Sequence, residues 1–170
     1  NGGNWGMASN AIHMLDLFVF LTQEERMSID SSDLDSKVYQ SKRKGFIELG
    51  GIIKAVNYKG DKLTLIDEKD STEQVVLDIK NKRHHYTIYQ FDGKIVSSHL
   101  EDGWKENSEF FKMPLQSELT HFFVENIIDN GNCDLTPLNE SYKIHKPMIE
   151  AFNSHLYNVC GMKYKVCPIA

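Results

Sequence analysis

The sequence has few of the features that would place a protein in a class at once. Its 170 residues include three cysteines, four prolines and two tryptophans, and its formal net charge is -5. A collagenous or wholly disordered chain is excluded, and no basic excess indicates a phosphate-binding surface, so we expect no nucleic-acid partner. The longest apolar run, residues 11–21, contains His13 and Asp16 and is shorter than a bilayer span. We therefore expect no membrane partner.

The cysteines and the N-terminus add expectations about compartment and completeness. Cys133, Cys160 and Cys167 are odd in number and widely spaced, which favours a reducing compartment, and we take the cytoplasm as the location. Zinc sites use closer pairs of cysteine or histidine, so we expect no metal site. The sequence begins Asn1-Gly2-Gly3 with neither an initiator methionine nor a signal-peptide pattern. We expect a piece cut from a longer chain.

Hydrophobic periodicity divides the chain into helical ends and a strand-rich middle. The nearly continuous apolar pattern of residues 7–21 predicts a buried helix, and the polar residues 22–44 predict a surface connection with one short element at most. Between Gly45 and Met113 the period falls to two. The predicted strands are 46–49, 52–58, 63–66, 75–79, 86–89, 94–96 and 110–111. Turn residues between neighbouring strands predict antiparallel hairpins.

Two further helices follow Pro114. Leu115 to Ile128 has an amphipathic period with Gly131 as its stop, and a second helix is expected with Thr136 as N-cap and a kink risk at Pro147. The order of elements predicts an α+β fold: a largely antiparallel sheet of about six strands, with helices covering one face. Apolar residues on both strand faces predict a partner against the other face.

The first predicted helix carries the residues best suited to chemistry. At 100° per residue, Ser9, His13 and Asp16 share one face, with Asn10 at its edge. A neutral imidazole at this position suits general acid and base catalysis near neutral pH. The alternative is a core histidine bonded to Asp16 or to a backbone carbonyl, and Ser9 and Asn10 also suit a helix start.

Other polar and aromatic residues have weaker signals. Asn4 and Trp5 precede the helix and suit a sugar pocket, although Trp5 fits plain packing equally well. His84 and His85 follow two basic residues at a strand start and are interpreted as a solvated edge. Structural roles are favoured for the histidines of the two late helices. These are His121, His145 and His155.

Four segments of the sequence resemble a known family. Residues 2–17, Gly-Gly-Asn-Trp-Gly-Met-Ala-Ser-Asn-Ala-Ile-His-Met-Leu-Asp-Leu, are similar to the Gly-Gly…Gly-x-His-x-x-Asp-Leu segment of the Gfo/Idh/MocA oxidoreductases, named after glucose-fructose oxidoreductase and inositol dehydrogenase. Residues 117–123 and 131–141, followed by Ile149-Glu150-Ala151, resemble its closing pattern. Together these segments bracket the chain and resemble the C-terminal domain of the family.

The resemblance implies an NAD(P)-dependent oxidoreductase that acts on a sugar, an inositol or a nucleotide sugar. Residues 1–170 then form the substrate-binding and oligomerisation domain, with the dihydrodipicolinate-reductase-like C-terminal fold and a homo-oligomer through the sheet face. The N-terminal Rossmann domain is missing, because no Gly-x-Gly-x-x-Gly follows a strand. NAD or NADP is therefore expected mainly in that missing half, with no cofactor-binding residue here, and the fragment alone is expected to be inactive.

The same resemblance assigns roles to residues. His13 occupies the position of the histidine that handles the proton of the reacting hydroxyl. Ser9 stands where the family has aspartate, Asn10 orients substrate, and Asp16 orients the ring or caps local structure. Asn4 and Trp5 complete the expected substrate-binding set. Two alternatives stay open: a non-catalytic ligand-binding or oligomerisation module, and a member that binds a nucleotide sugar without turning it over.

Overall fold

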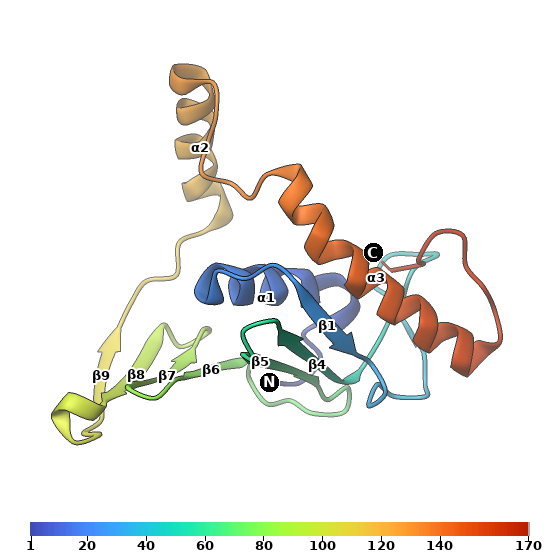
Figure 1. Ribbon diagram of the computed structural model, residues 1–170, viewed down its shortest axis with the longest axis horizontal. Coiled ribbons are helices and arrows are strands. Elements are labelled where there is room, and N and C mark those ends of the chain that lie inside the picture. The colour runs from blue at the N-terminus through green and yellow to red at the C-terminus, as the bar shows by residue number, and fades with distance from the viewer. Residues whose placement is uncertain (170) are drawn as a thin grey trace. The chain divides into compact units, whose positions relative to one another are not determined.

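The computed structural model describes residues 1–169 and shows two compact units (Figure 1). The first unit contains the chain up to Glu73 and the chain from Pro137 onward, and the second is Gln74–Thr136. Among the described residues, no helix combines the length and the apolar character that a membrane crossing requires.

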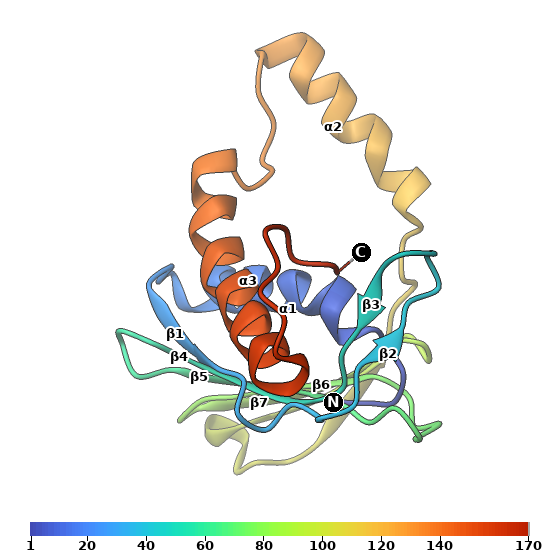
Figure 2. The ribbon, with the colours of Figure 1, turned by 90° about the vertical axis from the view of Figure 1, so that its right-hand side faces the viewer.

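The first unit places two helices on a small antiparallel sheet. Its elements are α1 (Met7–Thr22), β1 (Met27–Asp30), β2 (Tyr39–Gln40), β3 (Ile47–Glu48), β4 (Gly51–Asn57), β5 (Lys62–Asp67) and α3 (Leu138–Cys160). Strand β4 lies between β1 and β5 in a three-stranded sheet, and β2 pairs with β3. Helix α1 contacts β5 and α3, and α3 contacts β1, so both helices cover the same face (Figure 2).

The core of this unit follows from the strand period of two. Along β4, Ile53 and Ala55 are buried while Lys54 and Val56 are exposed. The buried side chains meet the apolar faces of both helices, where Leu15 of α1 and Phe152 of α3 are completely buried. Burying large apolar side chains of this kind stabilises the fold by about 2 kcal/mol each. This core fixes α1 on the sheet.

The second unit is a four-stranded antiparallel sheet followed by a helix. Its elements are β6 (Val76–Lys80), β7 (His84–Tyr89), β8 (Lys94–His99), a 3-10 turn (Leu100–Asp102), β9 (Asn107–Phe110) and α2 (Gln116–Asn130). The strands lie in sequence order. Helix α2 has the expected amphipathic pattern, but its apolar side chains are exposed, including Phe122 at 54% and Ile127 at 49%. It does not cover this sheet.

The predicted α+β class and antiparallel hairpins are confirmed. The strands are divided among sheets of three, two and four strands, rather than one sheet of about six. The connection over residues 22–44 holds two short strands, β1 and β2, where one element at most was expected. Both are short and partly exposed, so their apolar period is weak.

The helix boundaries agree closely with the sequence, with one correction. Gly131 ends α2 with a left-handed backbone, φ 72°, as expected. Helix α3 begins at Leu138 with Pro137 as its N-cap, so the expectation that Thr136 is the N-cap is wrong by one residue. The extended backbone of Pro137, ψ 151°, explains the shift, because a residue in that region stands outside the helix. The helix continues through Pro147.

Candidate functional site

The N-terminus of α1 is held by a buried carboxylate from the end of β5. Asp67 is completely buried, and its Oδ2 accepts hydrogen bonds from the backbone N–H groups of Met7 at 2.9 Å and Gly6 at 3.2 Å. Its Oδ1 accepts from the N–H of Trp5 at 3.3 Å, and the Lys69 ammonium donates to Oδ2 at 2.6 Å. The carboxylate thus satisfies free N–H groups at the positive end of the helix.

A second carboxylate binds the same first turn of the helix. The Oε1 atom of Glu48 in β3 accepts from the N–H of Ala8 at 2.5 Å and from the N–H of Leu49 at 3.0 Å. The Ser9 hydroxyl donates to Oε2 at 3.0 Å. Two carboxylates from different sheets therefore fix the start of α1 on the unit.

These contacts occupy three of the residues predicted to bind substrate. The Ser9 hydroxyl is bonded to Glu48, and the Asn10 amide donates to the carbonyls of Trp5 at 2.8 Å and Gly6 at 3.1 Å. The Trp5 indole N–H donates to the carbonyl of Ile66 at 2.7 Å. All three side chains are half-buried and hold the helix start in place, which agrees with the helix-start and packing alternatives.

The other predicted residues lie on or beside the outer surface of α1. His13 is exposed, so the alternative of a core histidine is wrong, and within residues 1–169 its imidazole has no hydrogen-bond partner. Asp16 is half-buried one turn further along the helix, and Asn4 is exposed with a left-handed backbone, φ 51°. The buried-helix prediction failed at His13 because an apolar pattern does not show which narrow stripe faces solvent.

A cavity of about 760 Å³ opens beside the Asp67 end of α1. Its lining includes Asp35, Tyr39, Asp67 and Lys69, and the Tyr39 hydroxyl donates to Asp35 Oδ2 at 2.9 Å. Burial, together with this hydrogen bond to Asp35, raises the pKa of Tyr39. Sequence reasoning missed this cluster. The one signal for this cluster in the sequence is Asp67, the charged residue that follows the apolar run 63–66.

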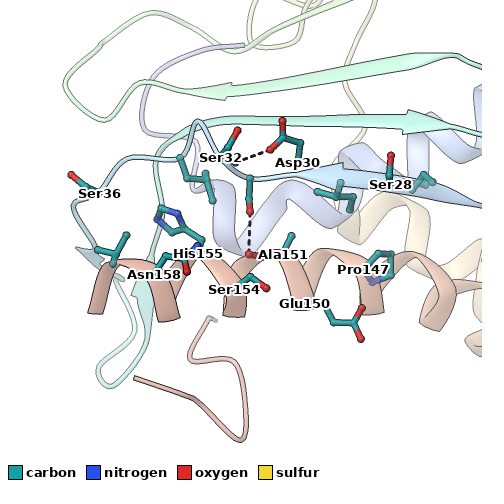
Figure 3. A pocket seen from close by; sticks show the side chains of 15 residues that line it. Ser28, Asp30, Ser32, Ser36, Pro147, Glu150, Ala151, Ser154, His155 and Asn158 are labelled. Atoms are coloured by element: carbon teal, nitrogen blue, oxygen red, sulfur yellow. Dashed lines mark hydrogen bonds between the residues drawn. The ribbon is translucent and has the colours of Figure 1, made fainter. Parts of the chain in front are cut away.

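A groove of similar volume, about 760 Å³, lies between β1 and α3 (Figure 3). Ser31 Oγ donates across it to the carbonyl of Ala151 at 3.2 Å. His155 is 7% exposed, and its Nε2 bonds the carbonyl of Asp35 at 3.0 Å. Because a carbonyl only accepts, Nε2 carries the proton in this pair. The structural role predicted for His155 fits this contact.

The glycine-rich start of the chain has a packing role in this structure. The Gly3 N–H donates to the carbonyl of Glu73 at 3.0 Å, and a Cβ atom at Gly3 would lie 2.1 Å from the carbonyl oxygen of Ser71. The helix that follows offers no free phosphate site, since Asp67 and Glu48 already bind its first N–H groups. The residues at this helix start therefore do not fit a dinucleotide pyrophosphate.

In residues 1–169, no group of three or more ligand side chains is placed to hold a metal ion.

Comparison with known proteins gives a fold likeness. No protein-family model matches the sequence, and no curated protein matches it. The structure resembles that of yvaA from Bacillus subtilis, a proposed oxidoreductase, with a TM-score of 0.56 and 12% identity over 90% of this chain. It also resembles a proposed NADPH-dependent oxidoreductase from Desulfitobacterium hafniense, with a TM-score of 0.52 and 8% identity over 89% of this chain. The chain spans about half of each, 51% and 49%.

Proposed function

We propose that this chain is the substrate-binding and oligomerising half of an NAD(P)-dependent oxidoreductase of the Gfo/Idh/MocA type. Its substrate would be a hydroxyl or carbonyl group of a sugar, an inositol or a nucleotide sugar. The observation that carries the proposal is the fold likeness, which extends over 90% of this chain and about half of a proposed oxidoreductase. The order of the sequence segments that resemble this family supports the same assignment.

His13 is the proton-handling residue in this proposal. Its imidazole is exposed on α1, and within residues 1–169 it has no hydrogen-bond partner, so its nitrogen atoms are free to meet a substrate hydroxyl. When the hydroxyl carbon is oxidised, the imidazole accepts the proton of the oxygen, and it returns a proton in the reverse reaction. A nicotinamide bound by another part of the protein would supply the hydride acceptor or donor.

The helix start provides the fixed support for this imidazole. Ser9 occupies the position where the family has an aspartate, but Glu48 brings a carboxylate to the same residue through the Ser9 hydroxyl. This contact supports the proposal by placing a carboxylate in the helix turn that precedes His13. The proposed substrate-binding residues around His13 are Asn4, Trp5, Asn10 and Asp16. Of these, Trp5 and Asn10 contribute by holding the backbone at the start of the helix in place.

Self-association through the sheet of the second unit completes the proposal. Leu77, Ile79, Tyr86, Ile88 and Ile95 lie on one face of this sheet, since paired residues share a face, and all are half-buried. No helix of the described residues in this unit covers that face. An apolar sheet face of this kind fits a second copy of the chain. The three free cysteines favour the cytoplasm as the location.

The test uses the full-length product of the gene, assayed with NAD and NADP against a panel of sugars, inositols and nucleotide sugars. We expect turnover of one substrate class, and we expect His13→Gln to lower kcat by about 10²–10⁴ with little change in KM. The matched control is His121→Gln, which alters another exposed helical histidine. A native product with a mass near 20 kDa, instead of about 35–45 kDa for two domains, would contradict the proposal.

A further inference from the structure

Two histidines face each other directly across the sheet of the second unit. His84 is the first residue of β7 and His99 is the last of β8, and the two are partners in the antiparallel ladder. Their Nδ1 atoms are 2.8 Å apart, and their ring centroids are 5.0 Å apart. With no metal bound, one ring donates an N–H to the other, because two unprotonated or two protonated nitrogens would repel each other at this distance.

The surroundings hold both rings in place. The backbone N–H of His84 donates to the Asn81 side chain at 2.8 Å, and Tyr86 stacks on His84 and meets His99 edge-on, with centroids 6.3 and 5.6 Å apart. Both imidazoles are half-buried, so solvent and small ions reach them. In the single chain the pair is thus positioned by backbone pairing and by an aromatic neighbour, and it is partly open to solvent. It lies at one end of the sheet face proposed above for self-association.

We propose that His84 and His99 form a two-histidine chelating site for a divalent transition metal that prefers square or octahedral geometry, namely Cu²⁺ or Ni²⁺. Metal–nitrogen bonds of about 2.0–2.1 Å with a right angle at the metal place the two nitrogens about 2.9 Å apart. Tetrahedral coordination needs about 3.3 Å. The observed 2.8 Å, a hydrogen-bond distance in the metal-free pair, is close to the spacing of neighbouring corners of a square or octahedral site. Metal binding breaks this hydrogen bond: the donor ring moves its proton from Nδ1 to Nε2, and each ring turns by about 45° so that both Nδ1 lone pairs point to one metal ion.

The remaining coordination positions fall to water. No third histidine, cysteine, aspartate or glutamate of the described residues joins the pair as a ligand, which separates this site from a closed structural zinc site. Imidazole nitrogens are suitable ligands for copper and nickel. The sequence predicted a solvated basic edge here and no metal site, so the proposal departs from both expectations. Pairing across the sheet explains the difference, because His84 and His99 are fifteen residues apart.

The experiment titrates the 170-residue chain with Cu²⁺ and with Ni²⁺ in a non-coordinating buffer, by calorimetry and by electron paramagnetic resonance of the copper complex. We expect one principal site whose spectrum shows two equatorial imidazole nitrogens. We expect His99→Gln to weaken binding at least tenfold. The matched control is His85→Gln, because His85 lies on the opposite face and bonds Asp78 at 2.7 Å. That change should alter the affinity less than threefold.

Folding is checked separately, because a substitution at His84 or His99 replaces an imidazole in a pair of neighbouring strands. His84→Gln is prepared beside His99→Gln, and both are compared with the unaltered chain by circular dichroism and urea unfolding without metal. Added Cu²⁺ should raise the unfolding midpoint of the unaltered chain and not of a folded variant. Equal affinity in the variants and the unaltered chain, or a spectrum with one imidazole nitrogen or none, overturns the proposal. Neither result depends on oxidoreductase activity.

Discussion

The buried ion pair at the start of α1 gives the sharpest test of how this fold is held together. Asp67 and Lys69 are joined at 2.6 Å, and their side chains are 0% and 7% exposed. Asp67 also accepts three backbone N–H bonds from residues 5–7, whereas the Lys69 ammonium has Asp67 as its one carboxylate partner in the described chain. The two partners therefore depend on each other unequally.

Because Asp67 has more partners than Lys69, the two substitutions should differ in how much stability they remove. Asp67→Asn leaves the buried ammonium uncompensated and weakens the cap, so we expect the free energy of unfolding to fall by about 3–5 kcal/mol. Lys69→Met leaves a carboxylate that still accepts N–H bonds at the positive end of a helix, so we expect a loss of about 1–2 kcal/mol. When Lys69→Met is already present, Asp67→Asn should cost about 1–2 kcal/mol, the value of a lost cap.

Urea unfolding measures these differences, with Trp5 fluorescence as the local probe in a Trp104→Phe background and circular dichroism as the global one. The matched control is the pair of Lys54 and Asp33, which has a similar distance of 2.5 Å but side chains 50% and 48% exposed. Asp33→Asn should cost less than about 1 kcal/mol. The reasoning is refuted if Lys69→Met destabilises the chain as much as Asp67→Asn, since the helix N-terminus would then contribute nothing to holding the carboxylate.

Three further outcomes test other parts of the structure. Phe152 is completely buried, so Phe152→Ala should lower the free energy of unfolding by about 3–5 kcal/mol in urea titrations, and a loss below 1 kcal/mol would contradict the described core. Hydrogen bonds from Arg26 lower the pKa of Glu24 to about 2, so the stabilisation it gives is present above its ordinary pKa and is lost as pH falls toward 2. A carbon-13 titration should show that midpoint, and Arg26→Ala should return it toward 4.5. Burial raises the pKa of the Cys167 thiol, so peptide mapping at pH 8 should show slower alkylation than at exposed Cys160, and equal rates would contradict it.

Local periodicity predicted the regular elements because their residues meet one buried face. The helix over residues 7–21 and the hairpin of β4 with β5 are of this kind. The division of the strands among three sheets was not predictable, because local periodicity does not show which strands pair. For example, β5 and β6, on either side of residues 68–75, belong to different sheets. The exposure of the apolar face of α2 was also not predictable, since an amphipathic pattern identifies a face without identifying what covers it.

The sequence predicted the helix that carries His13, but it did not predict the residues that hold the start of that helix. Glu48 and Asp67 lie forty and sixty residues from the α1 N–H groups that they bind, so no local spacing connects them to α1. Ser9 and Asn10 were interpreted as substrate-binding residues because of the family resemblance. In the structure these side chains serve the helix start, where a hydroxyl and an amide find partners nearby.

The assignment of His13 gains strength from the contacts of its neighbours. At the start of α1, the side chains of Trp5, Ser9 and Asn10 each have a hydrogen-bond partner inside the first unit, whereas the His13 imidazole has none in the described residues. A catalytic group has to be held by a rigid element while its reacting atoms stay free. Asp67 and Glu48 hold the first turn of α1, and His13 follows about one turn after Ser9 on the same rigid helix. Fixed support below a free imidazole therefore supports the proposal that His13 transfers a proton to a bound hydroxyl.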